Sequence, residues 1–448
     1  MRLREFPRKI GISRKIGLVN VVLLANAFIW YFLAFSIIRE LIASLSLSET
    51  ETLAVLGVDI ISMAVSGVVG SIVVEKLGKR ARFLYLWTFV GIFLSVVPAV
   101  FTISTYLQLT IFSCFIGLYF GLGMPATMGY FAASTNSGSR SRIAGLSFLF
   151  IALAFSSLGN VGLGNITFAG LILTAVRVIG FFLLSLLRIS EKVAEKRQKI
   201  SYTQVLSNRS FILYFIPWCM FLLVNYLTVP VQNKVFLQGD TAQFSAVLEN
   251  ILVAIFAVVS GFLADILGRK RLVIIGFAIL GIGYAALGLS PTLAGWYFYT
   301  IVDGIAWGIF FTLLLFTIWG DLAQERNSEK FYVIGALPYL LSNFMRIALG
   351  SFVSGIAETA IFSFASFFLF LAVLPLVYAP ETLPDKVMKD RDLKSYLEKA
   401  KKKVQKDSEK KHKKEDNEPK NGGEEPERKT GENSKEYVEA QKLAEKYY

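Results

Sequence analysis

Residues 261–271 of this chain read GFLADILGRKR. This stretch places one acid, Asp265, and three bases directly after an apolar run. A related string, SIVVEKLGKR, occupies residues 71–80, and its acid, Glu75, lies 190 positions before Asp265. A charged turn that occurs twice, each time at the end of an oily segment, predicts a chain built from a repeated unit.

The composition indicates a membrane protein. Of the 448 residues, 54% are hydrophobic and 14% aromatic, which is more apolar side chain than a soluble core of this length hides. Apolar runs of about 20 residues are long enough to cross a bilayer as helices. These runs do not alternate as the strands of a membrane barrel would. They fall at residues 16–38, 52–74, 83–101, 107–131, 143–163, 166–187, 211–229, 244–267, 272–289, 293–319, 332–353 and 357–377. The sequence predicts an all-α protein with twelve transmembrane helices.

The net charge is +13. The distribution of the basic residues along the chain fits membrane topology and does not indicate a nucleic-acid partner. With an even number of helices, both termini lie on one side. Placing that side in the cytoplasm puts 23 lysines and arginines in the short inner segments, against Arg39 and Lys234 outside. This asymmetry is the positive-inside pattern. We expect a multi-pass protein of the cell membrane with both termini in the cytoplasm.

The residues needed for most enzyme and metal chemistry are scarce. The one histidine, His412, lies in the charged tail, and the two cysteines, Cys114 and Cys219, lie within apolar runs as small filler. The phosphate-loop pattern G-x-x-x-x-G-K-[ST] does not occur. We therefore expect no catalytic residues, no metal site and no cofactor, and the chain is not predicted to be an enzyme.

The repeat extends beyond the charged turns. Sliding the sequence against itself by 190 positions matches helix 2 with helix 8, and a slide of 187 places GLYFG (117–121) on GIAWG (304–308). Two similar bundles around a midplane site are a device of transporters. The predicted organisation is a cytoplasmic segment 1–15, a six-helix bundle 16–189, a cytoplasmic linker 190–209, a pseudo-symmetric second bundle 210–380, and a charged, largely disordered cytoplasmic tail 381–448.

The two charged turns resemble the signature G-x-x-x-D-R-x-G-R-R of the major facilitator superfamily of secondary transporters. The second turn matches it at Gly261, Asp265, Gly268, Arg269 and Lys270, and the first at Glu75, Lys76, Gly78, Lys79 and Arg80, with Ser71 at the leading glycine. The resemblance implies the fold of that family over about residues 1–385. The alternative interpretation of the turns is a purely topogenic one, since bases at such turns obey the inside rule.

The resemblance also implies a charge lock on the cytoplasmic side. The acid of each turn would face a helix N-terminus of the other half, and the bases would meet a nearby acid. Asp321 matches as the partner of Arg269, whereas the end of helix 4 offers no equivalent acid for Lys79 and leaves the first lock incomplete. The gating residues implied here are Glu75, Lys79, Arg80, Asp265, Arg269 and Asp321.

Four charges lie deep within the predicted helices, where each costs about 2.5 to 3.5 kcal/mol unless it has a partner or a water-filled cavity. Asp59 and Arg346 share their helix faces with small and polar residues, and the resemblance implies that their helices, 2 and 11, meet across the two halves. We expect them to form an outer gate, or else to be two separate charges. Asp303 is expected to couple protons or to form a structural ion pair. Arg177, on peripheral helix 6, is expected to pack locally or to contact lipid headgroups.

Helices 1 and 7 carry amides together with aromatic rings, and the resemblance implies that these two are corresponding central helices. Such a mixture suits a substrate cavity for a solute with polar and ring-like or apolar parts. The alternative for such aromatics is the interfacial belt. The candidate substrate-binding residues are Asn26, Trp30, Trp218, Asn225, Tyr226, Asp303, Trp307 and Arg346.

These observations together predict a secondary transporter that moves a small organic solute by alternating access, with protons as possible coupling ions and the lipid bilayer as its surroundings. The rival hypothesis is a membrane sensor or anchor that does not transport and signals through its charged C-terminal tail.

Overall fold

The computed structural model describes residues 14–158, 164–189, 198–236, 239–324, 326–384 and 389. The helical body ends at Thr382, and the chain from Leu383 onward forms a separate unit. The predicted N-terminal segment 1–15 and the predicted tail 381–448 lie almost entirely outside the described residues, as does the first part of the predicted linker.

The described part of the first half of the body contains six helices. Two of them start with a capping box, at Ser48 and at Thr105, in which the hydroxyl and a side chain three residues later satisfy free backbone N–H groups. The second helix ends at Gly78, whose φ of +60° suits glycine. The helices are α1 (Arg14–Ser44), α2 (Glu49–Leu77), α3 (Arg80–Val100), α4 (Tyr106–Ser134), α5 (Ser137–Leu158) and α6 (Ile166–Leu187).

The short helix α7 (Tyr202–Leu206) precedes the second half. One helix of that half contains a π-helical turn, a feature that is frequent at functional sites. The elements are α8 (Arg209–Val235), α9 (Asp240–Leu267), α10 (Arg269–Leu289), α11 (Leu293–Phe310), the π-helix η3 (Phe311–Thr317), α12 (Ile318–Ala323), α13 (Glu329–Ala348), α14 (Gly350–Val353), α15 (Glu358–Leu371) and α16 (Val373–Tyr378).

The prediction of an all-α membrane protein is confirmed. In the part of the chain that the structure describes, eleven helices are long and apolar enough to cross a membrane, and extended backbone is limited to one isolated bridge between Gln198 and Arg326. The α11, η3 and α12 segments form one such span, and α15 and α16 form another. Helix α5, with 22 residues, is not among the eleven, so the exact number twelve stays a prediction.

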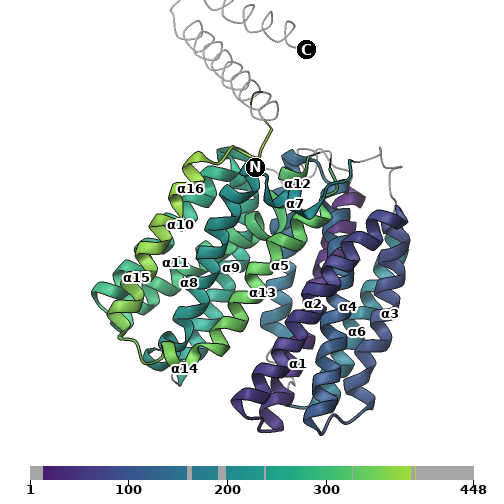
Figure 1. Cartoon of the computed structure of the whole chain (residues 1–448), viewed down its shortest axis with the longest axis horizontal. Coiled ribbons are helices and arrows are strands. Elements are labelled where there is room, and N and C mark those ends of the chain that lie inside the picture. Colours follow the sequence, from purple (N-terminus) through teal and green to yellow (C-terminus); the bar gives the residue numbers. More distant parts are fainter. Residues whose placement is uncertain are drawn as a thin grey trace, which may run out of the picture. The chain divides into compact units, whose positions relative to one another are not determined.

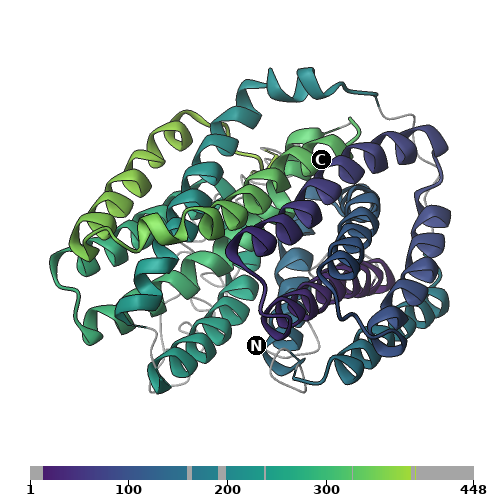
Figure 2. The same ribbon diagram turned by 60° about the horizontal axis from the view of Figure 1, so that its bottom comes forward.

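The helices of the two halves have equivalent neighbours. Helix α2 packs on α4 as α9 packs on α11, α3 packs on α6 as α10 packs on α15, and α1 packs on α5 as α8 packs on α13. Figure 1 shows α3 and α6 at one edge of the body and α10, α15 and α16 at the other, with α7 and α12 at one end and α14 at the opposite end. Figure 2, in which the lower end of Figure 1 comes forward, shows the two halves as two groups of helices.

The glycines that the sequence repeat aligned explain the closest of these contacts. A Cβ at Gly117 or Gly121 would collide with backbone of α2, at Asp59 and Met63 respectively. A Cβ at Gly308 would lie 2.8 Å from the backbone nitrogen of Ala257 on α9. Small residues let transmembrane helices approach closely. The repeated glycine spacing therefore corresponds to repeated packing of α4 on α2 and of α11 on α9.

Candidate functional site

The second charged turn, between α9 and α10, contacts residues in the first two turns of α5, a helix of the other half. Asp265 lies at the end of α9 and is fully buried. Its Oδ1 accepts a hydrogen bond of 2.6 Å from the Ser141 hydroxyl, and its Oδ2 lies 2.6 Å from Nε of Arg142. The acid of this turn therefore meets the N-terminal part of a helix of the other half.

Asp321, in α12, binds a base from each half. It forms ion pairs with Arg269 of its own half and with Arg140 of α5. Arg269 is fully buried and also donates to the carbonyl of Ser137. The predicted contact between Arg269 and Asp321 is confirmed. The sequence interpretation missed Arg140 and Arg142, although the string SRSR at 139–142 places both bases at a helix start.

The first charged turn, between α2 and α3, is tied to the first turn of α13. Glu75 Oε2 accepts from Lys330 Nζ at 2.8 Å, and Arg80 Nε lies 2.6 Å from Glu329 Oε1. The prediction that the first lock lacks an acid was wrong in this respect, because α13 and not helix 4 supplies Glu329. Lys79 is exposed, and the base that pairs is its neighbour Arg80.

The chain just before α8 lies on the seam between the halves at the same end. Lys330 Nζ donates to the carbonyl of Ile200 at 2.6 Å, and the Tyr202 hydroxyl lies 2.7 Å from that of Ser71 on α2. The backbone N–H of Asn327 donates to the carbonyl of Gln198. Burial raises the pKa of Tyr202 above its ordinary value. We call this end of the body, where both charged turns and α7 lie, the α7 end.

A cavity of about 330 Å³ lies between the two halves. The first half contributes α1, α2 and α5, and the second contributes α8, α9, α11, η3 and α13. Eight aromatic side chains line it, together with amides and three charged groups. The aromatic residues are Tyr31, Phe32, Phe35, Phe148, Tyr226, Trp307, Phe311 and Tyr339, the amides are Asn225, Asn250 and Asn343, and the charged residues are Arg39, Glu249 and Arg346.

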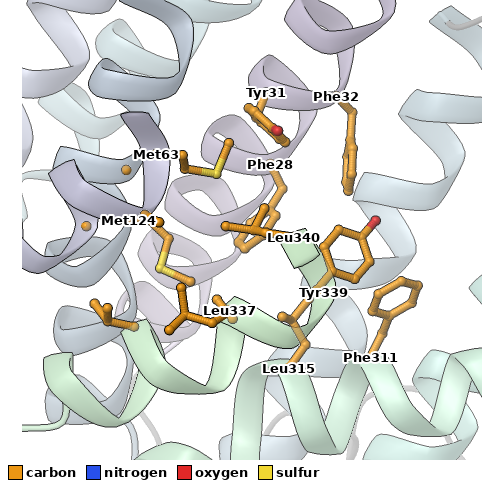
Figure 3. A pocket seen from close by; sticks show the side chains of 15 residues that line it. Phe28, Tyr31, Phe32, Met63, Met124, Phe311, Leu315, Leu337, Tyr339 and Leu340 are labelled. Carbon is orange, nitrogen blue, oxygen red and sulfur yellow. The ribbon is translucent and has the colours of Figure 1, made fainter. Parts of the chain in front are cut away.

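A smaller cavity of about 60 Å³ is lined almost wholly by apolar side chains. Figure 3 shows Met63 and Met124 on one side of it and Leu337 and Leu340 facing them. Five residues line both cavities, so they form the boundary between a polar and an apolar space. They are Tyr31, Phe32, Phe311, Tyr339 and Leu340.

The polar groups of the larger cavity are fixed by their neighbours. The guanidinium of Arg346 lies over the ring of Tyr226, 5.7 Å from its centroid, a cation–π contact. Tyr226 itself packs edge-on against Trp307 and Tyr339. The Asn225 amide donates to Asp303 at 2.9 Å, which orients its oxygen away from that carboxylate.

The two charges of the predicted outer gate have other partners in this conformation. Asp59 is fully buried, and its Oδ2 accepts a 3.2 Å hydrogen bond from Tyr31, whose ring lines both cavities. Among the described residues, Asp59 Oδ1 has no hydrogen-bond partner. Arg346 lies over Tyr226. The structure therefore does not bring Asp59 and Arg346 into an ion pair, and the outer gate stays a prediction.

The fold of the chain is similar to that of known transporters, although its sequence is not. No protein-family model matches the sequence, and no curated protein matches it either. The structure is similar to that of the human organic anion transporter MFSD10 (TETRAN), with a TM-score of 0.60 and 14% identity over 81% of this chain and 100% of that one. It is also similar to the major facilitator superfamily proton:xylose symporter XylE bound to 6-bromo-6-deoxy-D-glucose, with a TM-score of 0.59 and 15% identity over 82% and 96% of the two chains.

The chain has the major facilitator fold. Within it, the structure places half of the predicted substrate residues on the cavity between the halves. Asn225, Tyr226, Trp307 and Arg346 line the larger cavity, and Asp303 contacts it through Asn225. Glu249 lines the same cavity and is partly buried.

Three other predicted substrate residues line neither cavity, and each of them is packed within its own bundle. Asn26 and Trp30, on α1, face α3 and α6: Asn26 donates to the carbonyl of Val176 at 2.7 Å, and the Trp30 indole donates to Ser95. Trp218 donates to the carbonyl of Gly335 within the second half. These contacts are structural, so we correct the assignment of all three residues to the substrate site.

Arg177 is buried in the same core of the first half, which excludes the expected contact with lipid headgroups and leaves local packing. Its guanidinium donates to Asn26 at 2.6 Å and to the Tyr119 hydroxyl at 2.7 Å. It also lies 4.8 Å from the ring of Trp30 and 4.3 Å from that of Trp87. Ring faces and neutral oxygens replace an acidic partner here.

Proposed function

We propose that this chain is a secondary transporter that moves a small organic solute across a membrane by alternating access. The observation that carries the proposal is the cavity of about 330 Å³ lined by both halves, together with ion pairs that join the halves; among the described residues, these pairs lie at the α7 end. A midplane site between two similar bundles that rock against each other is the arrangement alternating access requires.

The charge distribution gives this conformation a direction. The positive-inside pattern puts the α7 end in the cytoplasm. The residues Arg39, Glu249 and Arg346 of the larger cavity lie near those ends of α1, α9 and α13 that point toward α14 (Figure 1). We therefore assign this conformation to the state whose cavity faces outward, with the pairs at the α7 end acting as the inner lock.

The similar solved proteins support the same class. One is described as an organic anion transporter and the other as a proton:xylose symporter. At 14 and 15% identity they share the fold with this chain, and neither fixes its solute. Absence of a P-loop pattern from the sequence agrees with transport driven by a gradient.

Proton coupling is a second part of the proposal. Asp59 and Asp303 are buried, and no base pairs with either of them within the described part of the chain. Asp59 touches the cavity residue Tyr31, and Asp303 touches the cavity residue Asn225. An isolated negative charge on a buried carboxyl group is costly, so protonation of the group is favoured there. Such a group can bind a proton in one conformation and release it in another.

The test is flux into vesicles that contain the purified full-length protein. We expect time-dependent uptake of a solute found by ligand-induced thermal stabilisation, and accumulation that collapses when the proton gradient is dissipated. A chain ending at residue 384 should transport as well as the full-length protein. Loss of all flux on this truncation, with the helical body still folded, would instead favour the rival sensor or anchor, and uptake that ignores the gradient would contradict the proton coupling alone.

A further inference from the structure

We infer that the transported solute is an organic anion, a carboxylate joined to an aromatic or branched apolar body. This inference rests on the proposed function and names the substrate class of the same cavity. It depends on three features of that cavity: a pair of guanidinium groups, a wall of rings and the adjoining apolar space.

Two arginines, one from each half, provide the anion-binding end. Arg39 on α1 and Arg346 on α13 both line the larger cavity, so their positive charges share one space. Neither forms an ion pair with an acid within the described residues. Two like charges that share a partly enclosed space are stabilised by an anion between them. A solute bound there contacts both halves at once.

The shape of the Arg346 group favours a carboxylate. Its guanidinium is held on the face of Tyr226, which limits its motion and leaves the edge of its planar fork for a ligand. That fork matches the two oxygens of a carboxylate in a bidentate pair. A ring packed under an arginine adds little cost when the anion binds, because the side chain is already ordered.

The ring wall and the apolar space indicate the rest of the molecule. Tyr31, Phe32, Phe311 and Tyr339 separate the larger cavity from the 60 Å³ one. Figure 3 shows the rings of Phe32, Tyr339 and Phe311 together at this border. A flat or branched apolar body fits between such rings, and its end reaches the space lined by Met63 and Met124. A solute whose surface is covered with hydroxyl groups would bury little apolar surface against these rings.

Among the described residues, Glu249 is the one acid that lines the cavity. It belongs to α9, whereas the two arginines belong to α1 and α13. Two positive charges against one negative charge leave the lining with a surplus of one positive charge. This surplus favours a monoanion over a neutral solute or a cation, and an ammonium on the solute is not required.

The experiment measures binding to the purified full-length protein by the shift of its thermal unfolding, which needs no transport. The matched probes are 3-phenylpropionate, its neutral amide, 3-phenylpropylamine, phenylalanine, acetate and a neutral pentose. We expect 3-phenylpropionate to stabilise the protein, the amide and the amine to bind at least about tenfold more weakly, and acetate to give no shift. Stabilisation by phenylalanine but not by 3-phenylpropionate would overturn the class in favour of a zwitterion, and stabilisation by the pentose alone would overturn it in favour of a sugar.

Variants tie the binding to the named residues. Arg346→Gln should weaken 3-phenylpropionate binding at least about tenfold, and Arg346→Lys should restore only part of it, because lysine keeps the charge but not the fork. Arg39→Gln, at an exposed position that tolerates change, should weaken it as well and keeps the test decisive if the Arg346 variants do not fold. The matched control is Arg209→Gln, an exposed arginine at the start of α8. Equal binding in all four variants would overturn the inference.

The two levels of the proposal fail differently. If vesicles transport the pentose and ignore every anion, the carrier function stands and the substrate class is wrong. If purified protein binds 3-phenylpropionate through Arg346 but vesicles show no flux of any probe, the site is correct and the carrier function is wrong.

Discussion

The two charged turns lie at equivalent positions in the two halves, but they hold the inner lock in different ways. The turn between α2 and α3 makes two separate ion pairs with successive residues, Glu329 and Lys330, of α13. At the turn between α9 and α10, Asp265 pairs with Arg142, and Asp321 pairs with both Arg140 and Arg269, so two acids meet three arginines, two of them from the other half. Topology repeats between the halves, and the electrostatics do not.

The difference in burial indicates which turn matters more. The side chains of Asp265 and Asp321 are 0% and 1% exposed, whereas those of Glu75 and Lys330 are 9% and 11% exposed. Removing one partner of a fully buried pair leaves an uncompensated charge, which is costly, and pairs nearer solvent are screened. We therefore expect the second turn to contribute most of the free energy of the closed inner lock.

Asp321→Asn should produce the largest effect, because it removes the shared partner of Arg140 and Arg269. The expected loss is about 3 to 5 kcal/mol for the state closed at the α7 end. The measurement uses Ala336→Cys, in the small cavity, as a reporter in a background without Cys114 and Cys219. Alkylation from the α7 side should rise at least tenfold.

The control for Asp321→Asn is Glu358→Gln, which neutralises an acid at the first turn of α15, outside the lock. Unchanged alkylation in Asp321→Asn, with normal insertion and unfolding, would show that this cluster does not hold the lock.

Arg80→Gln should produce a smaller effect, about 1.5 to 3 kcal/mol, because one charged hydrogen bond to the buried acid Glu329 is lost. The neighbouring Lys79→Gln is the matched control, since Lys79 is exposed and makes no ion pair within the described residues. The same reporter should respond to Arg80→Gln and not to Lys79→Gln. Equal responses would mean that the loss of positive charge in the turn, and not the pair with Glu329, governs the lock.

Much of the fold followed from the sequence because its causes are local or periodic. Helix length follows from apolar run length, and the paired glycines at 117 and 121 and at 304 and 308 mark the same close contact in each half. The contact of Arg269 with Asp321 followed from a motif. In each case the pattern that carries the information lies within one or two segments of the chain.

The rest of the site depends on which face of each helix points into the cavity. A single sequence does not specify that orientation. Asn26 and Arg346 are both polar groups deep in apolar helices, yet Asn26 faces its own bundle and Arg346 lines the cavity between the halves. The lock partners Glu329 and Arg140 lie near the starts of α13 and α5, and neither belongs to the charged turns that repeat in the sequence. The π-helix η3, which places Phe311 and Leu315 on the small cavity, has no signature in its residues FTLLLFT.

The smallest effect is expected where the chain before α8 meets the first turn, and it concerns a departure from the family motif. Ser71 stands where the signature has its leading glycine, and its hydroxyl bonds that of Tyr202 at 2.7 Å. Tyr202 is in turn packed near Lys330, which binds Glu75. The serine thus connects the segment between the halves to the weaker of the two turns.

Tyr202→Phe and Ser71→Ala should each weaken the closed lock by about 0.5 to 1.5 kcal/mol, the net contribution of one hydrogen bond. The double variant should cost no more than either single variant, because both remove the same bond. The alkylation reporter at Ala336→Cys measures all three, with Thr203→Ala as the control for a change in α7 that leaves both hydroxyls in place. If the two single effects simply add, Ser71 and Tyr202 act independently, and the segment before α8 is a passive tether that happens to lie on the seam. If they do not add, the first turn has gained from Ser71 a neutral contact that partly compensates for its more exposed charges, and this would explain how a less buried turn serves the same lock as the buried cluster of the second half.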